Sequence, residues 1–205
     1  MNLNFDPLKK YSGILVHPSS LPGGSYCGTF GKSVQDWIEI LSIHKIHTWQ
    51  FLPLSPTDSM GSPYSSPSSF AINPWFLDVD ELIESNFIKE TNQAKKFQLD
   101  AEKLDFFQFK VADELSNLLG NLLIDSWEFQ SFDRKNQFYL WCNNNSWVNN
   151  FSVFMTLKEE FNFSAWWHWP EEFKHKNKLV IEQWERNNAK PILKKKLIQW
   201  HLNRQ

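Results

Sequence analysis

The chain has 205 residues, of which 41% are hydrophobic and 21% are charged, a composition that indicates one or two folded domains and excludes disorder. Aromatic side chains make up 16% of it and can supply both a core and flat surfaces for stacking on a ligand. A formal net charge of -2 leaves no basic excess to neutralise phosphates, so we expect no nucleic-acid partner and no membrane partner.

The two cysteines, Cys27 and Cys142, lie far apart in the sequence. They form neither a disulfide framework nor the close pair that a structural zinc site needs. Residues 1–7 lack the charged start and apolar run of a signal peptide, and no window approaches the roughly 20 apolar residues of a membrane span. We therefore expect a cytoplasmic protein.

The first half of the chain predicts a strand, a helix and a second strand. Gly13–Val16 is a short apolar run typical of a buried parallel strand, and Thr48–Leu52 repeats the pattern before Pro53. Between them, a helix over residues 32–47 carries one apolar stripe, made of Val34, Trp37, Ile38 and Leu41. This order predicts a βαβ unit with parallel strands. We expect Trp49 and Gln50 to be core residues of the second strand.

The segment from Pro53 to Pro74 has five prolines and seven serines, so it is neither strand nor helix. Long ordered loops of this kind are commonly functional. Beyond Asp80 the pattern becomes helical, and Pro191 suits the first turn of the last helix. The predicted helices cover Phe106–Leu123, the stretch around Trp147–Met155, Leu179–Trp184 and Ile192–Leu202, with a turn and helix start at Asn143–Ser146.

Three segments resemble the amylomaltase family of 4-alpha-glucanotransferases, in order and at suitable spacing. The first runs from Ser12 to Gly23, and the most specific joins Trp49–Thr57 to Ser62-Pro63-Tyr64 and Ser69–Pro74. The third combines Trp147–Lys158 with Trp166–Pro170. The end of the chain, Ile198–Gln205, is similar to the helix before the family's third barrel strand.

The resemblance implies an α/β fold, a partial (β/α)8 TIM barrel containing the first two strands, with a largely helical insertion subdomain. Residues 1–80 would form the first βαβ part with active-site loops, 81–190 the mainly helical insertion, and 191–205 the helix leading back to the barrel. It also implies transfer of an α-1,4-glucan segment to a 4-hydroxyl of an acceptor sugar by a retaining mechanism. The expected partners are α-1,4-glucans or maltooligosaccharides, and no cofactor or metal is expected.

The resemblance and the residue chemistry together select four substrate-binding candidates: Tyr64, Ser62, Asn73 and His17. Tyr64 matches a family Tyr that contacts the sugar at the cleavage point, and its ring and hydroxyl suit a sugar face. The alternatives remain open. Tyr64 could pack the proline-rich loop, Asn73 before Pro74 could set a turn, and His17 could be a structural histidine.

Other polar and aromatic clusters have ordinary structural explanations. The acids at 78–84 and Glu171-Glu172 suit the first turns of helices, whose dipoles favour negative charge. His44 and His47 lack further nearby ligands for a metal. For Trp166-Trp167-His168-Trp169 we favour packing over a sugar platform, because large aromatics serve cores first.

The family's nucleophile, acid/base and supporting Asp come from later barrel strands, so the resemblance assigns no catalytic residue in this chain. We expect the chain to be inactive alone, as a gene fragment, a decayed product, or one part of a split enzyme completed by a second polypeptide. The alternatives are a non-catalytic α-glucan-binding module and an interaction protein that assembles through its exposed barrel face.

Overall fold

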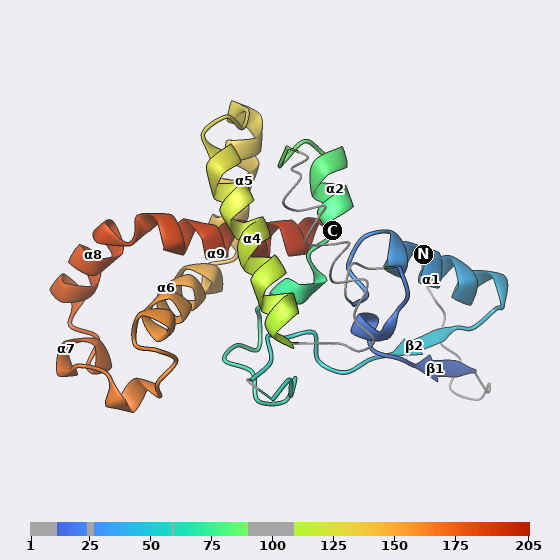
Figure 1. The fold of residues 1–205 in the computed structure, drawn as a ribbon, viewed down its shortest axis with the longest axis horizontal. Coiled ribbons are helices and arrows are strands. Elements are labelled where there is room, and N and C mark those ends of the chain that lie inside the picture. The colour runs from blue at the N-terminus through green and yellow to red at the C-terminus, as the bar shows by residue number, and fades with distance from the viewer. Residues whose placement is uncertain (1–11, 24–26, 59, 90–108) are drawn as a thin grey trace.

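The computed structural model describes residues 12–23, 27–58, 60–89 and 109–205, with a small sheet at one end of a mainly helical chain (Figure 1). Strand β1 (Gly13–Leu15) pairs in parallel with β2 (Thr48–Gln50), and α1 (Lys32–Ile43) forms the crossover between them. The predicted βαβ unit is therefore confirmed. Both strands end earlier than predicted, although the Val16 amide still donates to the Gln50 carbonyl at 3.1 Å.

The two faces of this sheet differ sharply in burial. Trp49 is half-buried, with its ring 6.3 Å from that of Trp37 on α1, and its indole N–H donates to the Val16 carbonyl at 2.8 Å. Because successive strand residues point to opposite faces, Leu15 and Gln50 lie on the other side and are exposed. The prediction that Gln50 is a core residue is wrong for this reason.

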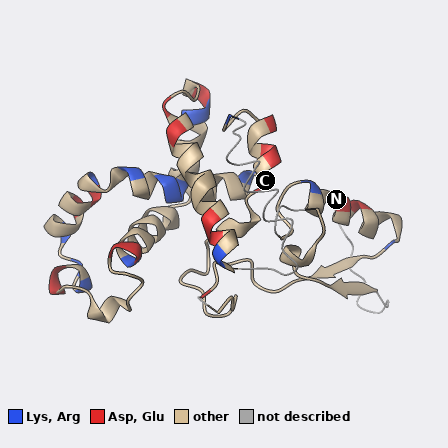
Figure 2. Cartoon of the chain, viewed as in Figure 1, with Lys and Arg blue, Asp and Glu red and all other residues tan. Residues whose placement is uncertain are grey.

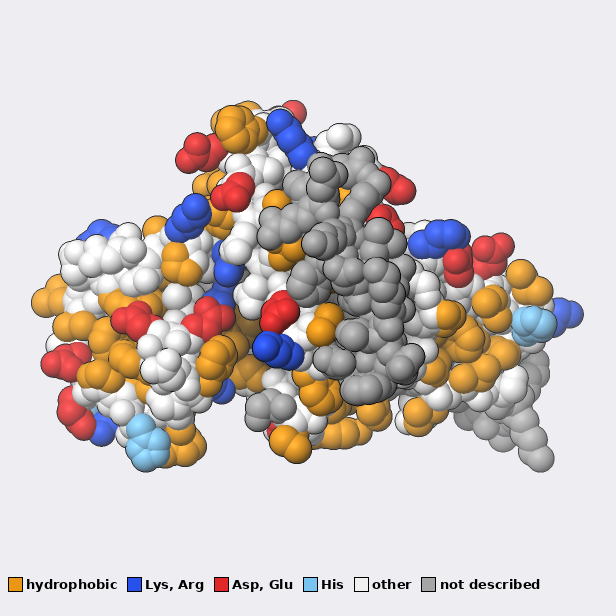
Figure 3. Space-filling view, in the orientation of Figure 1, with side chains coloured by type: hydrophobic (Ala, Val, Ile, Leu, Met, Phe, Trp, Pro, Cys, Tyr) orange, Lys and Arg blue, Asp and Glu red, His pale blue; other side chains and the backbone are white. Residues whose placement is uncertain are grey.

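Apolar side chains also remain exposed on and beside α1, where Figure 3 shows hydrophobic groups gathered at that end of the molecule. They include Leu15, Ile38, Ile40, Ile43 and Phe51. Helix α1 stops at Ile43 instead of near His47, since Lys45 takes a φ of 54°, the left-handed conformation that ends helices.

Outside the sheet, the regular structure of the described residues is helical and includes the 3-10 turns η1 (Pro18–Ser20), η2 (Pro74–Phe76) and η3 (Trp166–His168). The helices are α2 (Val79–Glu84), α4 (Phe109–Trp127), α5 (Phe132–Asn144), α6 (Trp147–Glu160), α7 (Glu171–Lys174), α8 (Lys178–Asn187) and α9 (Ala189–Arg204).

Most of the predicted helices are confirmed, with shifted ends. The predicted start at Phe106 lies outside the described residues, and Pro191 falls in the first turn of α9 as expected. Helix α5 was not predicted, because its sequence FDRKNQFYLWCNN shows no clean apolar stripe. Ser131, whose side chain accepts a hydrogen bond from the Arg134 amide, is the start signal that could have revealed it.

Helix α9 is the centre of the core. Its buried residues Leu197, Trp200 and Leu202 share one cluster with Leu115 and Leu119 of α4 and with the residues around η2. Gly120 brings α4 and α9 close together, since a Cβ there would lie 2.9 Å from Ile198 Cδ1. A second cluster, Leu157, Trp169, Trp184 and Ile192, joins α6, α8 and α9.

Charged side chains are absent from β1 and β2 and gather on the helices (Figure 2). Two lysines of α9 reach α6: Lys195 Nζ lies 2.6 Å from Glu159, and Lys196 Nζ lies 2.6 Å from Asn149. These contacts add polar ties to the α6–α9 packing.

Candidate functional site

The candidate site is built on the loop that follows the C-terminal end of β2, residues 54–73, which we call the β2 loop. Its base is closed by the Asn73 amide, which donates to the Leu54 carbonyl at 2.8 Å. In parallel α/β folds, binding residues gather on loops at this end of the strands.

Short side chains fix the interior of the β2 loop. Asp58 Oδ1 accepts from the amides of Met60 and Ser62, both at 2.9 Å. The Ser62 amide bond, and after it those from Met60 and the Ser65 hydroxyl, lower the pKa of Asp58 against the opposing effect of desolvation. Gly61 has a φ of 78°, and a Cβ there would collide with the Phe109 ring of α4.

Tyr64 and Ser62 lie together in this loop. Ser62 Oγ accepts from the Tyr64 amide at 3.4 Å, which holds the backbone of the turn. The Tyr64 side chain is 73% exposed, so it does not pack the proline-rich loop. Its ring and hydroxyl are therefore accessible to a ligand.

Asn73 is buried, and its Oδ1 accepts from the Trp75 amide at 3.1 Å. That bond caps η2, so the side chain sets the turn that Asn-Pro sequences favour. The structure thus gives Asn73 a role in shaping the base of the β2 loop.

His17 follows β1 and is half-buried, with its ring 5.6 Å from that of Phe76. Its Nδ1 lies 2.7 Å from Ser19 Oγ and its Nε2 lies 3.5 Å from the Pro53 carbonyl. A carbonyl only accepts, so Nε2 carries the proton and Nδ1 accepts from the Ser19 hydroxyl. Burial lowers the pKa of His17, outweighing the Pro53 hydrogen bond, so the ring is neutral at pH 7.

A cavity of about 670 Å³ lies between the β2 loop and helices α4, α6 and α9. Aromatic rings and polar groups line it together, among them Trp75, Phe109, Phe151, Asp113, Lys158 and Gln199. Of the four predicted residues, Asn73 lines this cavity, whereas Tyr64, Ser62 and His17 do not. Such mixed lining is typical of sites that bind polar organic ligands.

The carboxylates at the cavity already bind protein donors. Asp113 Oδ1 accepts from the Trp75 indole N–H at 2.7 Å, Glu159 pairs with Lys195, and Asp58 accepts two amides. A general acid for glycoside chemistry needs a raised pKa, whereas the pKa of Asp58 is lowered. The hydrogen bonds and ion pair of these three carboxylates suit ligand binding and structural roles and not acid catalysis.

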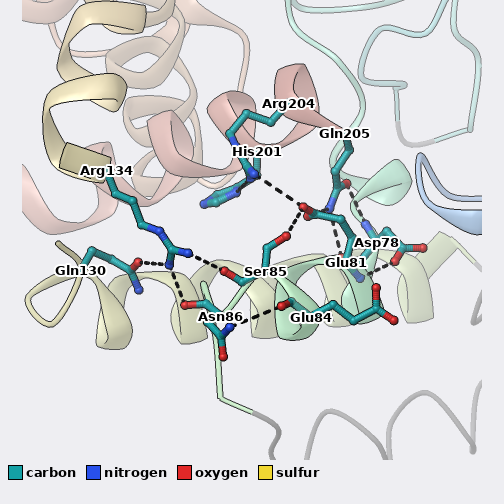
Figure 4. Close-up of polar contacts among 10 residues, drawn as sticks. All are labelled: Asp78, Glu81, Glu84, Ser85, Asn86, Gln130, Arg134, His201, Arg204 and Gln205. Carbon is teal, nitrogen blue, oxygen red and sulfur yellow. Dashed lines mark hydrogen bonds and ion pairs between the residues drawn. The ribbon is translucent and has the colours of Figure 1, made fainter.

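Asp78, Asp80 and Glu81 lie at the start of α2, as predicted, whereas Glu84 is its last residue. Asp78 is the N-cap of α2 and accepts from the Glu81 amide at 2.8 Å. Figure 4 shows Glu81 bound by Arg204 at 3.6 Å and by Gln205 Nε2 at 2.8 Å, from the end of α9. Glu171 and Glu172 likewise stand in the first turn of α7.

The aromatic cluster before Pro170 divides into two kinds of residue. Trp169 is buried against Phe154 and Phe161, as the packing prediction requires. Trp166 and Trp167 are exposed, so packing explains only part of the cluster.

No group of three or more His, Cys, Asp or Glu suited to a metal occurs among the residues that the structure describes. Within the same residues, no helix is long and apolar enough to cross a bilayer.

Sequence reasoning missed most of the cavity lining. Asp113, Phe151 and Gln199 come from three helices, and their convergence depends on how α4, α6 and α9 pack. Gln199 stood in a segment that resembled the family, but no local signal distinguished it from its neighbours.

The two parallel strands with their helical crossover, the loop after β2 and the helical subdomain define an α/β protein. An amylomaltase from Streptococcus agalactiae, solved in complex with acarbose, matches 96% of this chain and 39% of its own with a TM-score of 0.82 at 24% identity. The 4-alpha-glucanotransferases of Streptococcus pneumoniae and Clostridium butyricum are 34% and 33% identical over 80% and 83% of this chain.

A family model described as 4-alpha-glucanotransferase, glycoside hydrolase family 77, matches residues 16–205. The chain belongs to this 4-alpha-glucanotransferase family. It spans about a third of the length of these curated relatives, 32% and 34% respectively.

Proposed function

We propose that the chain supplies a glucan-binding part of a 4-alpha-glucanotransferase, which transfers an α-1,4-glucan segment to the 4-hydroxyl of an acceptor sugar with retention. The family match over residues 16–205 carries this proposal. The acarbose complex of the related amylomaltase supports maltooligosaccharides as the ligands.

We place the glucan on the β2 loop, with Tyr64 as its main contact. The exposed Tyr64 ring can cover the apolar face of a glucose unit while its hydroxyl donates to or accepts from the sugar. Ser62 supports it through the Tyr64 amide, and Asn73 shapes the loop base. His17 supports the site indirectly, by holding Ser19 and Pro53, because both of its ring nitrogens already have hydrogen-bond partners.

The proposal includes a (β/α)8 barrel completed by further strands. The exposed apolar residues on β1 and beside α1 support this, since uncovered strand faces favour association. The mixing experiment below tests whether a second polypeptide supplies these strands. Within the chain we keep the proposed division into residues 1–80, 81–190 and 191–205 and a cytoplasmic location, which the two buried free thiols support.

We further propose that these 205 residues bind glucan without turnover. Retaining transfer needs two carboxyl groups about 5 Å apart, one of them protonated, and the cavity carboxylates are committed to protein donors. The test is maltotriose disproportionation, followed by chromatography of longer and shorter maltooligosaccharides. The purified chain should show none, and a complementing polypeptide should restore it if the enzyme is split. Glucose release by the chain alone would overturn this part.

Binding is tested by titration with maltoheptaose. Tyr64→Ala should weaken it by about tenfold, as expected for losing one aromatic contact and a hydrogen bond. Tyr139→Ala is the matched control, because Tyr139 is also exposed but lies on α5. Equal affinities of the two variants would remove the β2 loop as the glucan surface.

A further inference from the structure

Gln199 of α9 and Gln205, the residue that follows α9, bind the backbone that links the β2 loop to α2. Gln199 Oε1 accepts from the Ile72 amide at 2.9 Å, and its Nε2 donates to the Ile72 carbonyl at 2.8 Å. Gln205 makes the same two bonds to Asp78: its Oε1 accepts from the Asp78 amide at 3.0 Å, and its Nε2 donates to the Asp78 carbonyl at 3.2 Å. Both pairs join residues 127 positions apart. Each glutamine thus forms a two-bond bridge from the C-terminal end of the chain to the backbone before α2, and we call these bridges the Gln199 rung and the Gln205 rung.

The Gln199 rung is buried. The residue is 2% exposed and lines the cavity, with its amide facing Ile72. Removing the side-chain amide would leave the Ile72 N–H and C=O without these partners in a site of low solvent access, which is costly for backbone groups. A carboxylate could accept from the amide but could not donate to the carbonyl, so an amide is the group that satisfies both.

The two rungs differ in what they hold. Ile72 directly precedes Asn73, whose amide closes the base of the β2 loop on Leu54. The Gln199 rung therefore anchors the loop itself, and the Phe70 ring nearby stacks on Trp147 of α6 at 6.1 Å. The Gln205 rung acts at the N-cap of α2, where its Nε2 also reaches Glu81 (Figure 4).

We infer that Gln199 is a positioning residue: it fixes the β2 loop on α9 and so sets where Tyr64 stands for a glucan. The claim that Tyr64 meets a glucan rests on the proposed function. The claim that Gln199 fixes the loop rests on the contacts of Gln199 alone. Gln205 provides an internal comparison, since it has the same chemistry and sequence separation but lies outside the loop.

The experiment compares the full chain with Gln199→Met and Gln205→Met, which keep side-chain length. The first loses the two hydrogen bonds to Ile72, and the second loses the two to Asp78 and the one to Glu81. Amide hydrogen exchange is followed by mass spectrometry in peptides covering residues 54–73 and 78–85. Gln199→Met should speed exchange in the loop by about tenfold, the effect of losing roughly one anchored hydrogen-bond pair. Gln205→Met should leave the loop unchanged and act on residues 78–85.

The same proteins are titrated with maltoheptaose. Gln199→Met should weaken the affinity about fivefold or more, whereas Gln205→Met should leave it unchanged. Loop exchange that is unaltered in Gln199→Met, or equally fast in both variants, would overturn the inference. Faster loop exchange with unaltered affinity would also overturn it, because Gln199 would then be structural only. If the unmodified chain binds no maltoheptaose, the proposed function fails, and the exchange result still decides whether Gln199 holds the loop.

Discussion

The β1–α1–β2 unit and the α9-centred helical core use the same kinds of apolar residue with opposite results. Leu15 of β1 is 61% exposed, whereas Leu115 of α4 is fully buried against its neighbours. Burial of apolar area is the main source of folding free energy. The comparison teaches that the stability of the described chain comes chiefly from its helices, while the strands leave apolar surface exposed.

The most direct test of this difference in stability is the same substitution, Leu to Ala, made in both regions. Leu115→Ala should lower the free energy of unfolding by about 2–5 kcal/mol, because it removes buried methyl groups and leaves a cavity. Leu15→Ala should change it by less than about 0.5 kcal/mol, as for most exposed positions. Urea unfolding followed by circular dichroism measures both. Equal losses would show that the sheet carries as much stability as the helices.

Acid should weaken the helical core through His201. Burial, and then the nearby charges of Arg204 and Arg134, lower the pKa of His201 to about 3, from 6.5. Between these values the unfolded chain binds a proton that the folded chain does not. The contribution of neutral His201 to the free energy of unfolding is therefore complete above pH 6.5. It is lost as the pH falls toward 3, by up to about 1.4 kcal/mol for each pH unit.

The control for this effect is His201→Asn, whose side-chain oxygen can still accept from Arg204, as His201 Nδ1 does at 3.2 Å. Asn does not titrate, so urea unfolding between pH 7 and pH 5 should show a shallower pH dependence in this variant. Identical slopes would mean that other groups cause the acid sensitivity.

A smaller effect should appear where the two regions meet. Asp78 caps α2 and accepts from the Thr29 hydroxyl at 2.5 Å, so it links the loop before α1 to the helical core. Asp78→Ala should cost about 1 kcal/mol, the usual value of an N-cap. Asp80→Ala, in the same first turn but without a capping bond, should cost clearly less. Thermal unfolding compares the stability of the two variants. Equal losses would show that the capping bond and the bond to Thr29 add no stability.

Sequence patterns predicted the parts of the fold that depend on local chemistry. The βαβ unit, the acids at helix starts and the turn before Trp147 are written in neighbouring residues. Helix α5 escaped because its apolar residues are scattered, and the exposure of Gln50 depends on what covers a distant face.

The candidate site divides in the same way. Tyr64 and Ser62 were selected through a short motif that holds its own turn, and their roles in binding stay predictions. The partners of His17 and the Gln199–Ile72 contact join residues far apart in sequence, so they required the packing of whole elements.

Gly120 gives the α4–α9 contact a further consequence. A methyl group at position 120 would press on the side chains of Lys194 and Ile198 of α9, and Ile198 is the neighbour of Gln199. The absence of a side chain at Gly120 thus lets α9 pack closely against α4. Because Gln199 follows Ile198 on α9 and bonds Ile72, we expect a larger residue at position 120 to shift the base of the β2 loop that carries Tyr64.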